Sequence, residues 1–492
     1  MNRALLLLAA ACCLSAQDSF QEIQSRVTSF TLKNGMTFIV LERHQAPVAS
    51  FLTLADVGST QEVKGITGLA HIFEHMAFKG SPTIGGNNYA EERLALDRVD
   101  QAFYALRGEH HKGARADPER LKRLEADFQA AQDGASKFVV KNEFGDAIDR
   151  AGGRDLNATT AQDSTRYFFS LPSNSAELWF FLESERFLNP VLREFYKEKD
   201  VVMEERRMSN ENNPIGKLLE EATHVAYKAH PYTEPVVGHM SDLQEITRAD
   251  AEAFFKKYYQ ASNLVSVVAG DVNPRQIRAW AETYFGRLPL APKPEPLRTV
   301  EPPQEGERRT TLRLKNEPVL LMAYHKTDIN HPDYPVYRAL AGVLSEGRSS
   351  RLYASLVRDQ KIAVMATGFT GLPGDKYPGL FSFAAFAAPG HTNQELEKAF
   401  DKEIERLKNE PVSAGELAGV KRRARVGLIS SLGDNVGLAN ALADWQMLTG
   451  DWRNLFRQLD RLDAVTAADI QRVAKTTFTT DNRTVAAIES IQ

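Results

Sequence analysis

One stretch of this sequence occurs twice, and the repeat restricts the fold more than any other feature. Ile246–Asp250 recurs 219 residues later as Val465–Asp469. The same offset relates three further pairs: Lys256 and Lys475, Tyr259 and Phe478, and Asn263 and Asn482. An ungapped match that runs through a helix, a turn and an apolar strand predicts two copies of one α+β unit.

A proline-rich segment separates the two copies. Residues 288–305 hold Leu-Pro-Leu-Ala-Pro-Lys-Pro-Glu-Pro and then Pro-Pro, a composition typical of an extended linker. A chain of 492 residues is also long enough for two domains with separate cores. We therefore expect an N-terminal domain at 17–287 and a C-terminal domain at 306–492.

Strands and helices are expected in the same order in both halves. Asn34-Gly35 between two β-favouring runs predicts a hairpin, followed by a strand at 49–55. A charged, alanine-rich stretch at about 90–149 predicts a helical hairpin, with Asp117-Pro118 starting its second arm. Thr67 is a candidate cap for the helix that follows it. Strands are expected at 309–315, 319–325 and 381–388.

The first sixteen residues are typical of a secretory signal. Arg3 precedes a short apolar run that ends at Ala16, where we expect cleavage. The run is too short to span a membrane as a helix. A lipoprotein anchored through Cys12 or Cys13 is the less favoured alternative. The mature chain would then be periplasmic or secreted and would contain no cysteine, which excludes a thiol enzyme.

Composition excludes one further class of protein. The chain is 43% apolar and 25% charged, with a net charge of −4. A nucleic-acid-binding protein would carry a basic face, so we expect no nucleic-acid partner.

The motif that carries chemistry is His71-x-x-Glu74-His75, inside the apolar run 68–78. On a helix His71 and His75 are one turn apart on one face, and Glu74 lies beside them. Two imidazoles with an adjacent carboxylate predict a zinc-ligand pair and a general base. Two core histidines with a surface glutamate would produce the same pattern.

The third metal ligand must come from elsewhere, since a hydrolytic zinc site has three protein ligands and one open position. A carboxylate is the natural choice, and Glu205 is our candidate. Glu198 lies two helical turns before it and could orient a ligating histidine. Spacing alone leaves four other candidates: Glu204, His224, His230 and His239.

A polar stretch at 157–170 is bounded by glycines and by Pro172, which indicates an edge strand. The free N–H and C=O groups of an edge strand can pair with an extended peptide. An ordinary solvated strand is equally compatible with this composition.

Several motifs in this order resemble those of the pitrilysin (insulinase-type) zinc peptidases, in particular bacterial relatives of the mitochondrial processing peptidase. These motifs are Gly68–Gly80, Asn157–Thr160 with Asp163 and Thr165, Glu198-x6-Glu205, His230–Tyr232 with Val237-Gly238, and Gly347–Leu352. The resemblance covers essentially the whole mature chain. It implies two homologous α+β domains, each an antiparallel sheet covered by helices.

The resemblance also implies roles for individual residues. His71, His75 and Glu205 match the zinc ligands, one ion per chain, and Glu74 matches the catalytic base. Glu198 matches a second important acid. Asn157 and Ala158 match the edge segment that pairs with substrate.

The sequence departs from the family pattern at two places. The interval from His75 to Glu205 is unusually long, which we attribute to the insertion at 90–149. The family's C-terminal half often supplies an Arg-x6-Tyr pair that holds substrate; here Arg358 is present, but Met365 replaces the tyrosine, or Val364 after a one-residue gap. Neither side chain donates a hydrogen bond to a developing oxyanion. We therefore expect a heterodimer in which a homologous chain supplies that pair.

The sequence thus predicts a zinc-dependent endopeptidase that cleaves peptides or unfolded segments. Two alternatives remain: a non-catalytic binding or assembly subunit, and a different metal-dependent hydrolase on the same frame. The four residues His71, Glu74, His75 and Glu205 disfavour the first alternative, and the edge strand disfavours the second. Cleavage preference and natural substrate are not predicted.

Overall fold

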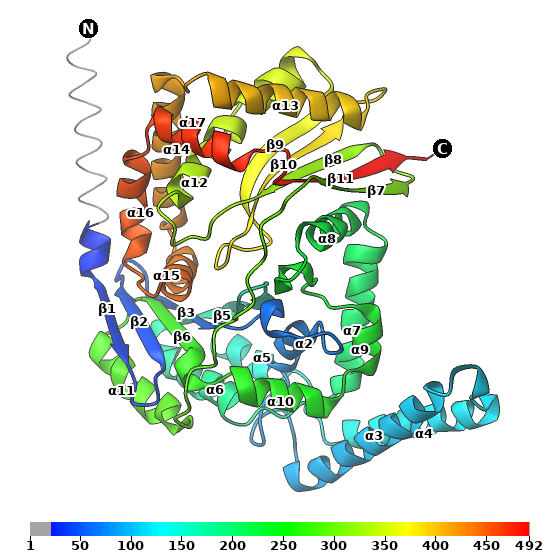
Figure 1. The fold of residues 1–492 in the computed structure, drawn as a ribbon. Helices are drawn as coiled ribbons and strands as arrows, with labels where there is room; N and C mark the ends of the chain where they lie inside the picture. Colours follow the sequence, from blue (N-terminus) through cyan, green and yellow to red (C-terminus); the bar gives the residue numbers. More distant parts are fainter. Residues whose placement is uncertain (1–20, 492) are drawn as a thin grey trace. The chain divides into compact units, whose positions relative to one another are not determined.

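The computed structural model describes residues 21–491, which fall into two packed units (Figure 1). We call 28–206 with 235–296 the N-terminal unit. The C-terminal unit comprises the described residues before 28, residues 207–234, and the chain from 297 to 491. Each unit has one sheet covered by helices, which confirms the predicted pair of α+β units. The expected signal segment, 1–16, lies outside the described residues.

The N-terminal unit contains a six-stranded sheet in the order β1-β2-β6-β3-β5-β4. Its strands are β1 Val27–Thr31, β2 Thr37–Glu42, β3 Val48–Ala55, β4 Arg154–Thr160, β5 Thr165–Pro172 and β6 Leu264–Gly270. Strand β6 pairs parallel to β2 and antiparallel to β3. Strands β3, β5 and β4 continue the sheet antiparallel. The single edge strand predicted at 157–170 is instead two strands: β4 forms the edge, and β5 lies inside the sheet between β3 and β4.

The C-terminal unit repeats this arrangement in five strands, in the order β7-β11-β8-β10-β9. They are β7 Arg308–Leu314, β8 Val319–His325, β9 Ala363–Leu372, β10 Leu380–Ala387 and β11 Arg483–Ser490. The last strand, β11, pairs parallel to β7 and antiparallel to β8, just as β6 pairs with β2 and β3. In each unit the final strand therefore inserts between two earlier strands and forms one parallel and one antiparallel pair.

The repeated stretches of sequence make matching contacts in the two units. Thr247 caps α10 and Thr466 caps α17, each through a capping box with an aspartate three residues later. The side-chain amide of Asn263 donates to the carbonyls of Asp56 and Tyr258. That of Asn482 donates to the carbonyls of His325 and Thr477. The two halves are thus copies in topology and in local hydrogen bonding.

The N-terminal unit has an aromatic core to which residues of its sheet and of several of its helices contribute. These helices are α2 Leu69–Met76, α3 Tyr89–His110, α4 Pro118–Ser136, α5 Glu143–Arg150, α6 Ala176–Leu188, α7 Phe195–Arg206, α9 Met240–Glu245, α10 Arg248–Tyr258 and α11 Pro274–Tyr284. The ring of Trp179 lies 5.0 Å from Phe51 and 4.8 Å from Phe180, centroid to centroid. Such aromatic pairs add roughly 0.5–1.5 kcal/mol each beyond the area they bury.

The helical insertion has the predicted form. Asp117 caps α4 and Pro118 occupies its first turn, so the chain reverses and α4 packs along α3. Phe103 of α3 packs on Tyr196 of α7, with ring centroids 4.4 Å apart, and this contact anchors the near end. The far ends of α3 and α4 extend away from the sheet of their unit (Figure 1).

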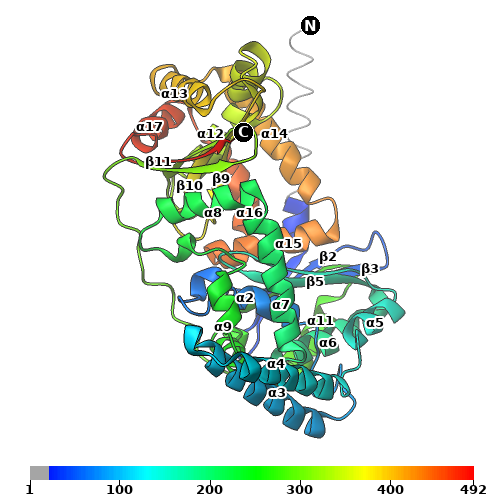
Figure 2. The ribbon, with the colours of Figure 1, turned by 90° about the vertical axis from the view of Figure 1, so that its right-hand side faces the viewer.

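The C-terminal sheet has helices on both faces. Its helices are α8 Pro214–Ala226, α12 Tyr334–Ser345, α13 Asn393–Asn409, α14 Ala414–Ser431, α15 Asn435–Thr449, α16 Asn454–Asp463 and α17 Ala467–Thr477. Figure 2 shows α12, α13 and α17 on one side of the sheet and α8 on the other. Leu218 and Ala222 of α8 pack with Leu321 and Ile488 of the sheet. Residues 207–234 precede the linker in the sequence but pack with the C-terminal unit. The predicted domain limits stay a prediction.

Two local expectations differ from the structure. Thr67 does not cap α2; the carboxylate of Glu62 does, accepting from the backbone N–H groups of Gly68 and Ala70 at 2.7 and 2.6 Å. Strand β9 was not predicted, because its sequence lacks a regular alternation of apolar and polar residues.

Candidate metal and catalytic site

Helix α2 buries one face and presents the chemistry of the motif on the other. Leu69, Ile72, Phe73 and Met76 are buried in the core of the N-terminal unit. The side chains of His71 and His75 stay 17% and 19% exposed. Their rings lie 5.1 Å apart, centroid to centroid, with planes nearly perpendicular. The interpretation as two core histidines is thus disfavoured, since neither ring is fully buried.

Helix α7 brings Glu205 to these two imidazoles. Its Oε2 lies 3.5 Å from His71 Nε2 and 3.7 Å from His75 Nε2. The three residues form a group that could hold a metal ion. Of the alternatives in the same unit, neither Glu204 nor His239 belongs to that group. His224 and His230 lie in the C-terminal unit.

This group fits a zinc ion by two tests. Ligand atoms about 2.0–2.1 Å from a tetrahedral zinc are separated by roughly 3.3–3.4 Å, close to the two nitrogen–oxygen distances found here. Two imidazoles and a carboxylate are also a donor set that zinc prefers when cysteine is absent. Their role as ligands remains a prediction.

Electrostatics shift the pKa values of the two histidines in opposite directions: they favour the neutral form of His71 and the protonated form of His75. Burial and the neighbouring His75 ring lower the pKa of His71 to about 4, so its imidazole is neutral at neutral pH, the form that binds a metal. Burial also acts to lower the pKa of His75, but its hydrogen bond to Glu198 and the charge of Glu205 outweigh burial and raise it.

Glu74 lies beside the group without belonging to it. Its Oε2 accepts a hydrogen bond of 2.6 Å from the Thr160 hydroxyl at the end of β4. Burial raises the pKa of Glu74 above its ordinary value, against the opposing effects of Thr160 and His75. A carboxylate with a raised pKa is suited to accept and return a proton near neutral pH.

Glu198 occupies the position predicted for an orienting acid. Its Oε2 lies 3.3 Å from His75 Nδ1, on the side of the ring away from Glu205. Burial opposes ionisation of Glu198, but the hydrogen bonds from His75 and Lys79 lower its pKa to about 2. It therefore remains an anion that fixes the orientation of the His75 ring.

Sequence analysis missed two members of this charged group, Lys79 and Glu194. Lys79 Nζ lies 2.6 Å from Glu198 Oε1 and 3.0 Å from Glu194 Oε2. No helical spacing signals these two residues, because Lys79 follows the end of α2 at Met76 and Glu194 precedes the start of α7 at Phe195.

Asn157 and Ala158 lie on the edge strand β4, where Asn157 is exposed and Ala158 is buried. Only one side of β4 is paired, with β5. The strand ends at Thr160, the residue bonded to Glu74. The free edge of β4 thus leads toward Glu74.

Arg358 and its expected companion lie in the C-terminal unit. Arg358 is exposed and pairs with its neighbour Asp359 at 2.7 Å. Val364 and Met365 are 65% and 46% exposed on β9, the edge strand equivalent to β4. The role of Arg358 in binding substrate stays a prediction.

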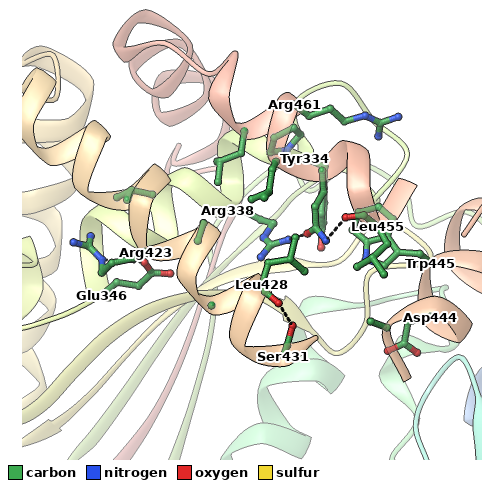
Figure 3. A pocket seen from close by; sticks show the side chains of 18 of the residues that line it. Tyr334, Arg338, Glu346, Arg423, Leu428, Ser431, Asp444, Trp445, Leu455 and Arg461 are labelled. Carbon is green, nitrogen blue, oxygen red and sulfur yellow. Dashed lines mark hydrogen bonds and ion pairs between the residues drawn. The ribbon is translucent and has the colours of Figure 1, made fainter. Parts of the chain in front are cut away.

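The C-terminal unit contains a cavity of about 610 Å³ between α12, α14, α15 and α16. In Figure 3 Glu346 and Arg423 lie together at one end, and Asp444 and Trp445 at the other. None of the residues predicted for catalysis or metal binding lines this cavity.

Comparison with known proteins places these features in a family. The sequence profile described as Insulinase (Peptidase family M16) matches residues 38–103, and that described as Peptidase M16 inactive domain matches residues 245–424. The first match contains the histidine motif. The second covers most of the half that lacks it.

Individual relatives match over nearly the whole chain. The chain is 27% identical over 472 residues to the zinc protease PqqE of Helicobacter pylori, covering 94% of this chain and 93% of that protein. It is 22% identical over 468 residues to the mitochondrial-processing peptidase subunit beta of Lentinula edodes, covering 90% and 86%.

A solved structure agrees with the sequence comparisons. The crystal structure of a protease from Helicobacter pylori superposes with a TM-score of 0.78 at 26% identity, covering 94% of this chain and 99% of that one. Two family profiles, relatives named zinc proteases and a shared two-unit fold lead to one conclusion: the chain belongs to the insulinase-type (M16) peptidase family.

Proposed function

We propose that the chain is a zinc-dependent endopeptidase that cleaves peptides or unfolded polypeptide segments. One observation carries the proposal: the nitrogens of His71 and His75 converge on Glu205, and Glu74 lies beside them at the end of a free strand edge. A non-catalytic subunit would not require this combination of ligands, base and strand edge.

His71, His75 and Glu205 would hold one zinc ion, which when bound supplies Lewis acidity and makes water acidic enough to lose a proton near neutral pH. Glu74 accepts that proton and later returns it to the leaving amine. Its Oε2 is already engaged by Thr160, so we assign the proton transfer to Oε1. Glu198 keeps the His75 ring in place throughout.

The free edge of β4 is the proposed docking site for substrate. An extended peptide that pairs with Asn157 and Ala158 forms backbone hydrogen bonds that do not depend on its side chains. Because β4 ends beside Glu74, such a peptide is led to the catalytic group. Most backbone N–H and C=O groups of a folded protein are already paired, whereas those of a peptide or an unfolded segment are available, which favours the latter as substrates.

Cleavage of a quenched peptide together with metal analysis tests the proposal. Glu74→Gln keeps the size of the side chain and removes the base, so we expect bound zinc to persist while kcat falls by about 10²–10⁴-fold. Glu204→Gln, on the same helix as Glu205, is the matched control and should retain activity. An inactive wild-type chain that still binds zinc would instead favour the alternative of a binding or assembly subunit. Absence of zinc from the wild type would refute the metal site.

We further propose that the active form is a heterodimer with a homologous chain that supplies an Arg-x6-Tyr pair. Arg358 is engaged by Asp359, and neither Val364 nor Met365 can donate a hydrogen bond. The purified chain should therefore cleave poorly alone and gain activity when such a partner is added. Full activity as a homodimer would contradict this part of the proposal.

We propose a periplasmic or secreted location. The support is the signal-like sequence up to Ala16. Between residues 21 and 491, no helix combines the length and apolar character needed to cross a bilayer. N-terminal sequencing of the mature chain should begin after Ala16. A lipid on Cys12 or Cys13 would favour the anchored alternative.

A further inference from the structure

A short segment that carries no catalytic residue contacts both helices of the candidate zinc site. This segment, 235–246, contains the loop at Gly238 and the helix α9 that follows it. Helices α2, α7 and α9 lie side by side in both views (Figures 1 and 2). The segment is thus in a position to set the distance between the histidines on α2 and the glutamate on α7.

On the α2 side, two glycines make a close backbone contact. Gly68, the first residue before α2, and Gly238 both have positive φ, 89° and 80°. A Cβ on Gly238 would lie 2.3 Å from the Thr67 carbonyl and 2.6 Å from Gly68 Cα. A Cβ on Gly68 would lie 2.7 Å from the Val237 carbonyl. The N-terminus of α2 therefore rests on the backbone at Gly238, with no space for a side chain on either residue.

On the α7 side, the same glycine accepts a hydrogen bond from Arg206. Arg206 Nη1 donates to the Gly238 carbonyl at 2.7 Å, and the arginine is only 8% exposed. Arg206 directly follows Glu205 in the last turn of α7. A chain of contacts therefore runs from Glu205 through Arg206 and Gly238 to Gly68, three residues before His71.

Two further contacts hold the segment in place. Asp242 Oδ2 accepts hydrogen bonds from the backbone N–H of Gly65 and from the Thr67 hydroxyl, at 2.9 and 2.7 Å. Lys199 Nζ, on α7, donates to the carbonyls of Gln244 and Ile246 at the end of α9, at 2.9 and 3.2 Å. The segment is therefore fixed to the loop before α2 at one end and to α7 at the other.

We propose that Arg206 is a positioning residue: through the Gly238 carbonyl it sets the separation between Glu205 and the pair His71 and His75, and thereby the affinity and geometry of the metal site. The inference rests on the proposed zinc site. A charged donor bonded to a backbone carbonyl in a largely buried place is a stiff contact, because its replacement would leave that carbonyl buried without its partner.

Metal binding to the metal-free protein tests the proposal without reference to catalysis. Zinc affinity is measured by competition with a chromophoric chelator for the wild type, Arg206→Met and Arg206→Lys. Loss of a residue that orients a ligand typically weakens metal binding by about 10–100-fold, so we expect that loss in Arg206→Met. Lysine retains a cationic donor and should recover most of the affinity.

The visible absorption spectrum of the cobalt-substituted protein is the second readout, because it reports the geometry of the ligands. Arg206→Met should shift the bands of the bound cobalt, and Arg206→Lys should restore them. The matched control is Arg248→Met, which removes ion pairs to Asp97 and Asp100 elsewhere in the same unit. It should leave both zinc affinity and the cobalt spectrum unchanged.

Equal zinc affinity and an unchanged cobalt spectrum in Arg206→Met would overturn the proposal. So would an equal loss of affinity in Arg248→Met, which would show an effect of stability alone. If Arg206→Met does not fold, Arg206→Gln, which is too short to reach Gly238 but remains polar, is measured against the same expectations. A wild-type chain that binds no zinc would instead refute the proposed function on which this inference rests.

Discussion

Helices α2 and α7 of the N-terminal unit correspond, by chain order and packing partners, to α12 and α14 of the C-terminal unit. Helix α2 packs on α7 and α10, and α12 packs on α14 and α17. The first pair places His71 and His75 opposite the carboxylate of Glu205. The second pair places Gly342 against Val420, so closely that a Cβ on the glycine would lie 2.7 Å from Val420 Cγ1.

The charged groups of the second pair neutralise each other. Glu346 follows α12 and forms an ion pair of 3.2 Å with Arg423 of α14, at one end of the cavity in Figure 3. A carboxylate paired with arginine cannot readily serve as a metal ligand. Equivalent helix pairs of the duplicated fold thus carry a candidate zinc site in one unit and an ion pair in the other.

The largest expected difference between the two halves is in metal binding. Glu205→Gln removes the charge of a proposed zinc ligand, whereas Glu346→Gln breaks a partly exposed ion pair at the equivalent contact. We expect the first to weaken zinc binding by more than about 100-fold, beyond the effect of an orienting residue. The second should leave zinc content unchanged and cost less than about 1 kcal/mol in the free energy of unfolding. Zinc analysis after dialysis gives the zinc content, and urea denaturation gives the free energy of unfolding. Zinc retained by Glu205→Gln would contradict the proposed difference between the two helix pairs.

A smaller loss of zinc affinity is expected for Glu198→Gln. Glu198 holds His75 Nδ1, so a neutral amide should orient the ring less firmly and weaken zinc binding by about 10–100-fold. Competition with a chelator gives the affinity. Glu194→Gln, which removes a contact to Lys79 but none to a histidine, is the control. An affinity for Glu198→Gln equal to that of the wild type would rule out the orienting role.

The shared frame itself can be tested with a matched pair of asparagines. Asn263→Ala and Asn482→Ala each remove two hydrogen bonds to backbone carbonyls, at equivalent places in the two halves. Leaving such carbonyls without a partner should cost about 1–3 kcal/mol in each variant. Asn263 is the more buried, so its loss should be the larger. A negligible cost in one half alone would show that the two copies are not equivalent.

The smallest effect is expected at the repeated helix caps. Thr247→Ala and Thr466→Ala each remove a capping hydrogen bond and should cost about 1 kcal/mol. Thermal unfolding compares the two variants with Thr247→Ser and Thr466→Ser, which keep the hydroxyl and should be close to the wild type. A serine variant as unstable as its alanine counterpart would mean that the lost methyl group, and not the cap, is responsible.

Local patterns predicted much of this architecture. The repeat around Thr247 and Thr466 indicated the duplication, and Asp117-Pro118 indicated the start of α4. Both signals include helix caps, whose hydrogen bonds join residues a few positions apart, so the local sequence is enough to predict them. The predicted cap of α2 was wrong, because the carboxylate of Glu62, in the loop before the helix, accepts the hydrogen bonds that were expected for Thr67. Strand β9 was missed for a related reason: its pairing with β10, and not its own composition, makes it a strand.

The sequence by itself determined the pair of α+β units, the placement of His71, Glu74 and His75 on one helix, and the family. These features follow from spacing along the chain, where the helical period and the repeat are sufficient. Only the tertiary structure brought Glu205 to within 3.5 Å of His71, led β4 to Glu74 through Thr160, and joined Arg206 to Gly238. Such contacts join residues far apart in sequence, and their distances depend on how helices pack against one another, which no local pattern encodes.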